Sequence, residues 1–466
     1  MTSGHLRTLA VSLQLIGGGW LILRTRPTRP STRRWAAADV DRQIANAALY
    51  AMMAFVLIAH LRLGASAIGA LMASILALKL LVAMRHRRRT VYGSAPANLR
   101  LCAVVPLHNE DPAYAVACLA SMISQTRAIE RIHVVDDGST DNGTAANAVR
   151  SYLEAHAGAL EWEVTILPEN VGKRHALAYG FLGDRRSEVY LCVDSDTLLA
   201  ADAVAEGLRP FSNPSVTAVA GVVSAHNRRR NLLTRLVDMR YVSAALSERA
   251  AYSAFGAVLC CCGSLSFFRS SVVRDNLHDF LNQRFLGQNA TFGDDRRLTN
   301  YALRAGRVVL AEHSQALTAV PERLSHFVRQ QVRWNKSFFR ESVWVVGTFP
   351  LASAAFWLTI CELASWIVFG SNLLTALVIL PMRSDSGQLP AILLLVGLAG
   401  WARNTAYLED RGMGVDRAER FLTFAIAPLY GILHIFVLMP ARLYALATIK
   451  QVRWGTRRGV EVRMSD

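Results

Sequence analysis

Residues 188–197 read EVYLCVDSDT, an apolar run that ends in two aspartates, Asp194 and Asp196. A short apolar run rich in β-forming residues is typical of a buried strand. Side chains two positions apart on a strand point the same way, so both carboxylates could approach one hard cation, which would in turn neutralise a diphosphate. The alternative is a helix N-cap followed by a solvated aspartate.

Three more apolar runs lie upstream, and helical patterns such as PAYAVACLASMISQ separate them. The runs are LRLCAVVPL (99–107), RIHVVDD (131–137) and WEVTILP (162–168). Repeated alternation of strand and helix predicts an α/β domain over residues 98–320, with a mostly parallel sheet and helices on both faces. Ligands of such sheets bind at the carboxyl ends of the strands, so polar residues there become candidates for a site.

A second pair of acids follows the strand predicted at 131–137. Asp136 and Asp137 precede Gly138 and Ser139. Carboxylates before a glycine turn can accept hydrogen bonds from a nucleotide base or ribose, because glycine lets the ligand approach closely. Asp-Gly-Ser is also the sequence of an ordinary turn, and both interpretations stay open.

A third pair, Asp294 and Asp295, lies in FGDDRRLTNYAL (292–303) at the expected start of a helix. Adjacent acids at such a position are usually stabilised by the helix dipole. An apolar strand that ends in Asp-x-Asp, as at Asp194 and Asp196, is typical of nucleotide-sugar enzymes, and an inverting sugar transfer needs one carboxylate to take the proton of the attacking hydroxyl. Asp295 is the best candidate in this chain.

QQVRWNKSFFRES (330–342) places Gln330, Arg333 and Trp334 on one helix face, at spacings of three and four residues. Arg333 could offset the charge of a leaving nucleoside diphosphate, Gln330 could bind a phosphate or sugar oxygen, and Trp334 could stack on a sugar ring. The alternative is an amphipathic helix at a membrane interface with snorkelling arginines, and we assign residues 335–341 to that class.

The composition indicates a membrane protein with a soluble part. The 466 residues are 52% hydrophobic with a net charge of +16, and arginines gather at the ends of apolar segments. That placement marks a cytosolic membrane face and argues against nucleic-acid binding, for which no motif is present. An odd number of cysteines in apolar surroundings argues against a disulfide framework. The seven are Cys102, Cys118, Cys192, Cys260, Cys261, Cys262 and Cys361.

The first apolar segments, 44–61 and 66–84, predict a transmembrane hairpin with cytosolic ends at 24–42 and 85–89. The segment 8–23 could be a third span, an interfacial helix or an uncleaved signal anchor.

Later in the chain, 352–380 and 389–402 are expected to span the membrane. Residues 420–449 are broken by Pro428, Gly431 and Pro440, so this segment should turn back as two half-passes or not cross. Glu362 and Arg403 fall in or beside these spans, where charge usually faces a water-filled interior. Interfacial placement is the alternative for Arg403.

Together these motifs resemble one family. VPLHNED, VVDDGS, NVGKRHAL, VDSDT, GDDRRLTNYA and QQVRWNKSFFRES occur in this order. They resemble the processive family 2 glycosyltransferases, which include hyaluronan, chitin and cellulose synthases and the rhizobial chito-oligosaccharide synthases. NQRFLG, RWNKSFFRES and WGTRR are most similar to the bacterial, streptococcal-type hyaluronan synthases. The resemblance covers about residues 45–458.

The resemblance implies a GT-A (Rossmann-like) α/β catalytic domain in the cytosol, fused to N- and C-terminal transmembrane α-helices that form a polymer channel. It also implies roles for individual residues. These are uridine contacts at Glu110 and Asp137, a diphosphate contact at Lys173, a nucleotide contact at Asp194, a metal ligand at Asp196, the base at Asp295, an acceptor and diphosphate clamp at Gln330, Arg333 and Trp334, an acceptor contact at Cys262, and a gating loop at Trp454, Thr456 and Arg457. Plain core packing is equally consistent with Cys262.

The predicted organisation is therefore an N-terminal extension (1–43), a transmembrane hairpin (44–90), the GT-A domain (98–320), interface helices (321–350), a channel region (351–449) and a cytosolic tail (450–466). The predicted activity is Mg²⁺- or Mn²⁺-dependent polymerisation of UDP-GlcNAc and UDP-GlcA into hyaluronan, with export across the plasma membrane. Alternatives are a chitin or chito-oligosaccharide synthase using UDP-GlcNAc alone, a non-processive transferase acting on a lipid carrier, and an inactive membrane scaffold.

Overall fold

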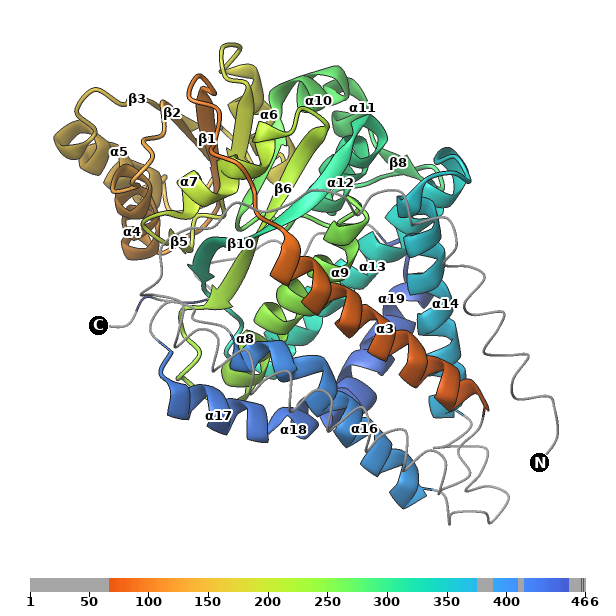
Figure 1. Ribbon diagram of the computed structural model, residues 1–466. Coiled ribbons are helices and arrows are strands. Elements are labelled where there is room, and N and C mark those ends of the chain that lie inside the picture. Colours follow the sequence, from red (N-terminus) through yellow and green to blue (C-terminus); the bar gives the residue numbers. More distant parts are fainter. Residues whose placement is uncertain (1–66, 375–388, 410–414, 452–461, 463, 465–466) are drawn as a thin grey trace. The chain divides into compact units, whose positions relative to one another are not determined.

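The computed structural model describes residues 67–374, 389–409, 415–451, 462 and 464. Its centre is an eight-stranded sheet of order β3-β2-β1-β4-β7-β6-β10-β5 (Figure 1). The strands are β1 (Leu101–Leu107), β2 (Arg131–Asp136), β3 (Glu161–Ile166), β4 (Val189–Cys192), β5 (Thr197–Leu199), β6 (Val216–Ala225), β7 (Ser266–Arg269) and β10 (Arg307–Thr318). A separate hairpin is formed by β8 (Arg284–Phe285) and β9 (Gln288–Asn289).

The four runs read from the sequence are β1 to β4, and they form the parallel half of the sheet. The other half is mixed, because β7 runs antiparallel to both β4 and β6, and β5 runs antiparallel to β10. The predicted α/β fold is confirmed, with more antiparallel pairing than the sequence indicated.

Helices cover both faces of the sheet, as β1 shows. Leu101, Ala103 and Val105 pack into one core, while Cys102 and Val104 pack into the other. This alternation follows from the two-residue repeat of a strand. The first core includes α4 (Pro112–Ile123), α5 (Thr144–His156) and α7 (Ala203–Leu208). The second includes α6 (Lys173–Leu182), α8 (Leu232–Ser243), α9 (Ala250–Ala254), α10 (Ser270–Asp275), α11 (Leu277–Leu281) and α12 (Asp294–Ala305).

The parallel half brings three loops to one edge. β1, β2 and β4 end at Leu107, Asp136 and Cys192, and their backbones are paired in register. Because parallel strands all point the same way, the loops that follow them lie side by side. This edge gathers the acids that the sequence analysis selected.

The remaining described α-helices lie before and after the sheet in the chain. They are α3 (Ala67–Arg89), α13 (Leu324–Thr348), α14 (Ala354–Leu374), α16 (Leu389–Asn404), α17 (Arg417–Ala425), α18 (Ala427–Leu433) and α19 (Met439–Ala447). Two helical stretches in the described part are long and apolar enough to cross a bilayer, Ala354–Ser371 and Ala427–Ala447. The predicted segments 8–23 and 44–61 lie outside the described residues.

The segment 420–449 is broken at Ile426, between the end of α17 at Ala425 and the start of α18 at Ala427, but Gly431 and Pro440 do not interrupt the helical run that follows. Residues 427–447 form one continuous helical run, in which a π-helical stretch, His434–Leu438, joins α18 to α19. Pro428 and Pro440 each lie in the first turn of a helical segment, where a missing N–H costs little. At 1.5 Å per residue the run is about 31 Å long, enough to cross a bilayer without half-passes.

The snorkelling interpretation of residues 335–341 is also wrong. These residues belong to α13, and Arg340 and Glu341 are only 3% and 2% exposed. The Arg340 guanidinium lies 4.0 Å from the ring centroid of Phe292, and Glu341 Oε2 lies 3.0 Å from Arg297 Nε. Glu341 also accepts hydrogen bonds from Gln283 and Asn300. Partners distant in the sequence therefore lock α13 onto α12.

Candidate active site

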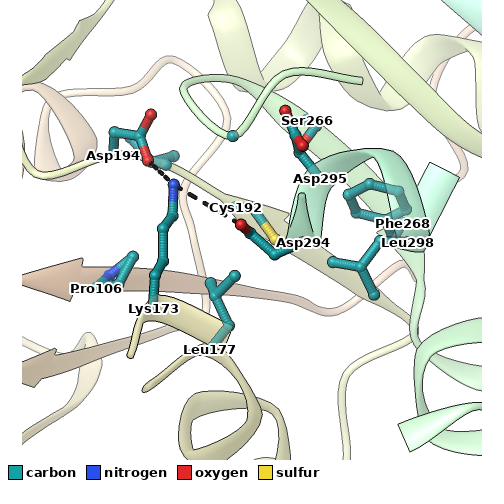
Figure 2. A pocket seen from close by; sticks show the side chains of 12 residues that line it. Pro106, Lys173, Leu177, Cys192, Asp194, Ser266, Phe268, Asp294, Asp295 and Leu298 are labelled. Carbon is teal, nitrogen blue, oxygen red and sulfur yellow. Dashed lines mark hydrogen bonds and ion pairs between the residues drawn. The ribbon is translucent and has the colours of Figure 1, made fainter. Parts of the chain in front are cut away.

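The centre of the candidate site is Lys173, the first residue of α6. Its Nζ donates a 2.5 Å hydrogen bond to Asp194 Oδ1 and lies 3.9 Å from Asp294 Oδ2 (Figure 2). Asp295 lines the same small cavity. Burial alone would lower the pKa of Lys173, but the carboxylates of Asp194 and Asp294 outweigh burial and raise that pKa above its usual value. The lysine therefore stays cationic among the acids.

The turn after the three consecutive cysteines closes over this pair. Ser264 donates from Oγ to Asp194 Oδ2 at 2.8 Å, so each carboxylate oxygen of Asp194 has a donor. A Cβ at Gly263 would lie 2.8 Å from Lys173 Nζ and 3.3 Å from Asp194 Oδ1. A side chain at position 263 would therefore require the end of Lys173 to shift.

Asp194 and Asp196 do not have the geometry predicted for them. β4 ends at Cys192, so both acids lie beyond the strand, and the next element is β5, not a helix. Asp194 contacts Lys173, whereas Asp196 Oδ1 accepts a 2.9 Å hydrogen bond from Thr318 at the end of β10. The N-cap interpretation is wrong because a strand, β5, follows Asp196, and the two acids do not share one extended strand because the chain turns between them.

The two predicted uridine contacts are buried and support the same loops. Glu110 Oε2 accepts a 2.8 Å hydrogen bond from Ser195 Oγ, and Ser195 lies between Asp194 and Asp196 in the sequence. Asp137 Oδ1 accepts from the backbone N–H groups of Val171 and Gly172, at 2.8 and 3.0 Å. Burial raises the pKa of Asp137 in spite of these donors. Asp137 therefore holds the turn from which Lys173 begins α6, whatever else it binds.

Asp294 and Asp295 occupy the first turn of α12, as predicted for a helix start, and both line the cavity beside Lys173. Burial, and then the charge of Asp294, raise the pKa of Asp295 to about 6, against the opposing effect of Lys173. A carboxylate with a pKa near neutrality is suited to take a proton.

Cys260 is a contact that the sequence analysis did not select. Its Sγ lies 3.7 Å from Asp295 Oδ2, where the thiol can donate. Burial raises the pKa of this thiol to about 12, so the thiol keeps its proton. The seven cysteines are all unpaired thiols.

A divalent cation at this site would depend on the substrate for ligands. No group of three or more His, Cys, Asp or Glu side chains in the described part of the chain could hold a metal ion. Asp196 supplies a hard carboxylate at the edge of the site, and Mg²⁺ is commonly held by one or two carboxylates plus substrate phosphates. The residues therefore fit an ion that arrives with a diphosphate.

The predicted clamp lies on α13. Trp334 is 47% exposed, and its ring centroid lies 6.0 Å from that of Tyr241. Gln330 Oε1 is buried and finds no hydrogen-bond partner among the described residues. Arg333 is half-buried on the same helix. An exposed aromatic face beside an unsatisfied amide oxygen is consistent with a saccharide-binding surface.

The other predicted contacts lie at the border of the site. Cys262 is half-buried, and Arg249 Nη1 donates to its Sγ at 3.8 Å. Trp454, Thr456 and Arg457 lie outside the described residues.

The described tail residues on either side of that segment contact the catalytic domain and α13. Lys336 Nζ donates to the Gln451 carbonyl at 3.2 Å, and Met464 N–H donates to Asp111 at 3.1 Å. The gating role of the tail stays a prediction.

Comparison with known proteins places this arrangement in a family. The family model described as glycosyltransferase-like family 2 matches residues 97–337. A hyaluronan synthase of Streptococcus pyogenes is 38% identical over 373 residues, which are 79% of this chain and 85% of that protein. This chain belongs to the family 2 glycosyltransferases.

Two further proteins are similar to this family 2 glycosyltransferase. An N-acetylglucosaminyltransferase of Rhizobium leguminosarum bv. viciae is 34% identical over 81% of this chain and 88% of its own length. The solved mannosyltransferase PcManGT of Pyrobaculum calidifontis, in complex with GDP-Man and Mn²⁺, superimposes with a TM-score of 0.50. It is 20% identical and covers 87% of this chain and all of that one, so it supports the GT-A-like fold alone.

Proposed function

We propose that this glycosyltransferase is a membrane-embedded, inverting hyaluronan synthase, which joins GlcNAc and GlcA from their UDP donors and exports the polymer. The observation that carries the proposal is the cavity in which Lys173 lies between Asp194 and Asp294 with Asp295 beside them. Similarity to a hyaluronan synthase over 85% of that protein supports the choice of product.

Asp295 acts as the base. It takes the proton of an acceptor hydroxyl as that oxygen forms its bond to the anomeric carbon of the donor sugar. The bond from the anomeric carbon to the diphosphate breaks on the opposite face, so UDP leaves with the electron pair and the configuration inverts. Cys260 holds Asp295 by donating to Oδ2, the oxygen 3.7 Å from its sulfur.

Lys173 and Arg333 stabilise the leaving diphosphate. Lys173 begins a helix, so the positive end of the α6 dipole and the ammonium group act on the same anion. When the diphosphate binds, its oxygens would replace the carboxylate oxygen of Asp194 as the hydrogen-bond acceptor of Lys173. A Mg²⁺ or Mn²⁺ ion held by Asp196 and the diphosphate would neutralise further charge on UDP.

The membrane arrangement belongs to the same proposal. The helical stretches Ala354–Ser371 and Ala427–Ala447 are long and apolar enough to span, and α3 ends in His86, Arg87, Arg88 and Arg89. Basic residues at the end of an apolar helix favour the cytosolic side, so the catalytic domain faces the cytosol of a multi-pass plasma-membrane protein. Trp334 and the helices beyond it then guide the growing polysaccharide into the membrane.

The second candidate is a chitin or chito-oligosaccharide synthase, which would use UDP-GlcNAc alone. Similarity to the Rhizobium N-acetylglucosaminyltransferase over 88% of that protein favours it. The same base, lysine and diphosphate contacts would serve either product, so the donor requirement separates the two.

The test is polymer formation by membranes that contain the protein, with Mg²⁺ or Mn²⁺ and each donor alone or both together. Polymer that requires both donors and is digested by hyaluronidase is the expected result. Product from UDP-GlcNAc alone that is digested by chitinase would replace the first candidate with the second. Absence of UDP release under all conditions would overturn both.

A further inference from the structure

Arg174 follows Lys173 at the start of α6, but the two side chains go to different places. Lys173 reaches into the cavity of the candidate active site (Figure 2). Arg174 is 1% exposed, and its guanidinium donates from Nη1 to the Phe280 carbonyl at 2.9 Å and from Nη2 to the Phe292 carbonyl at 3.5 Å. The first distance is ordinary for a hydrogen bond and the second is long. The helix therefore begins with one cation in the cavity and one in the protein interior.

The two carbonyl groups lie on either side of the β8–β9 hairpin in the chain. Phe292 directly precedes Gly293, whose φ of +89° turns the chain into α12, and Asp294 and Asp295 follow in the first turn of that helix. By holding the backbone before and after the hairpin, Arg174 fixes the path of the chain into the helix that carries the proposed base.

Phe292 is held through its ring as well as its carbonyl group. The side chain is buried, and the Arg340 guanidinium of α13 lies 4.0 Å from the ring centroid, a cation–π contact. The Phe280 ring lies 5.0 Å from the guanidinium of Arg174 in the same way. The residue that leads into α12 is thus held by one arginine of α6 and one arginine of α13.

Arg174 is a costly residue for the stability of the fold. It forms no ion pair with another described residue, and its Nε finds no hydrogen-bond partner among them. Burial lowers the pKa of Arg174, and the charge of Asp294 is the strongest of the effects that oppose burial. Replacing a buried charge by an apolar side chain of similar size is often neutral or stabilising. A buried arginine whose hydrogen bonds go to carbonyl groups therefore indicates a role other than stability.

We propose that Arg174 is a positioning residue, which fixes Asp295 relative to Lys173 by holding the chain on either side of the β8–β9 hairpin. The base and the contact to the leaving group must keep their separation, and an error of about 1 Å in such a geometry can lower the rate by about a hundredfold. The inference rests on the proposed function, because it takes Asp295 as the base and Lys173 as the diphosphate contact. It adds a residue that neither binds the donor nor takes the proton.

The first measurement compares Arg174→Met and Arg174→Lys with the wild type, in membranes that contain the full-length chain. We expect Arg174→Met to lower kcat by about tenfold to a hundredfold, because the base is displaced. Arg174→Lys keeps the charge and one contact to a carbonyl group, so we expect a loss of about threefold to tenfold. UDP affinity should change by less than about twofold, because Asp137 holds the turn from which α6 begins.

The decisive measurement combines Arg174→Met with Asp295→Asn. If Arg174 acts only through the base, UDP release by the double variant should match that of Asp295→Asn within about twofold. A purely structural role would instead lower the residual rate by the same factor as in the wild type. That additive result would overturn the inference, and so would a wild-type kcat in a folded Arg174→Met variant.

Arg185→Gln is the matched control, because Arg185 is an exposed arginine just beyond the end of the same helix. It should leave kcat unchanged. Thermal unfolding shows whether each variant is folded. If Arg174→Met does not fold, Arg174→Lys replaces it in the combination with Asp295→Asn. A wild-type kcat for Arg174→Lys would then mean that Arg174 serves stability alone, and the inference would be wrong.

Asp295→Asn by itself separates failure of the inference from failure of the proposed function. Full transfer by this variant would overturn the assignment of the base, and the proposed mechanism with it. Loss of transfer by Asp295→Asn, together with an additive effect of Arg174→Met, would overturn the inference alone. Because the measurement follows UDP release, it applies to a hyaluronan product and to a chitin product equally.

Discussion

The two ends of the site differ in the sign of their fixed charge. At the donor end, one lysine lies among Asp194, Asp294 and Asp295. At the predicted acceptor end, Arg249 donates to Cys262 Sγ and Arg442 donates to Asn335 Oδ1, and neither arginine forms an ion pair with another described residue. The donor end therefore holds a group that titrates near neutrality, whereas arginines stay charged at every accessible pH. The contrast teaches that pH should act on the first end and ionic strength on the second.

The largest effect should come from removing the base. Asp295→Asn keeps the shape of the side chain but cannot accept the proton, so we expect transfer to fall by about a thousandfold. UDP binding should change little, because the base is not a nucleotide ligand. UDP-sugar turnover and UDP binding are measured on the same preparation. A matching loss of UDP binding would mean that Asp295 is a nucleotide ligand, and the proposed comparison between the two ends of the site would then be wrong.

Lys173→Met should have the next largest effect. It removes the ammonium group that lies between Asp194 and Asp294, and with it the proposed charge-assisted contact to the diphosphate. We expect donor affinity to fall by about tenfold to a hundredfold. The acid limb of the pH profile should also move to higher pH, because Lys173 lowers the pKa of Asp295. An unchanged limb would contradict the assignment of that limb to Asp295.

The pH dependence of the wild-type enzyme tests the titrating group directly. Asp295 must be ionised to act as a base, and burial raises its pKa to about 6. The value of kcat/KM should therefore be constant above that pH and fall by about tenfold per unit below it. A steady-state profile between pH 5 and 8, taken with both donors, measures this limb. A limb near pH 4 would mean that the site is wetter than the structure indicates.

The smallest effect should come from Gly263→Ala. The added methyl group would meet Lys173 Nζ at 2.8 Å and press the Lys173–Asp194 pair apart. Because the obstructing atom is the end of a flexible side chain, we expect only about a threefold to tenfold rise in KM for the donor. Gly347→Ala is the matched control, since nothing lies within 4 Å of a Cβ there. An equal change in KM for Gly263→Ala and Gly347→Ala would mean that the close approach of Gly263 to Lys173 does not affect donor binding.

The strands and the gathering of acids could be predicted from the sequence. An apolar run that ends in carboxylates, repeated in parallel strands, places those carboxylates at one edge whatever the details of packing. Lys173 was selected only through family resemblance, because a lysine after a glycine carries no distinctive local pattern. Cys260, Gly263 and Ser264 were not selected as contacts of these acids, because they reach the site from a turn in which Ser264 lies 70 residues beyond Asp194.

The errors share one cause, which is contact with distant parts of the chain. Asp196 faces Thr318, more than a hundred residues away, so a local strand model could not place its carboxylate. Arg340 looked like a snorkelling residue because its neighbours in sequence are apolar, yet Phe292 and a buried ion pair enclose it.

The packing of α12 against α13 has a consequence for polymer growth. Gly293, at the start of α12, lies so close to Ser337 of α13 that a Cβ there would come within 2.2 Å of Ser337 Oγ. The Glu341–Arg297 ion pair also joins α12, which carries the proposed base, to α13, which carries Trp334. Under the proposed function, this packing of α12 on α13 sets the distance between the point of attack and the stacking surface, and the growing chain would have to advance past that distance after each addition.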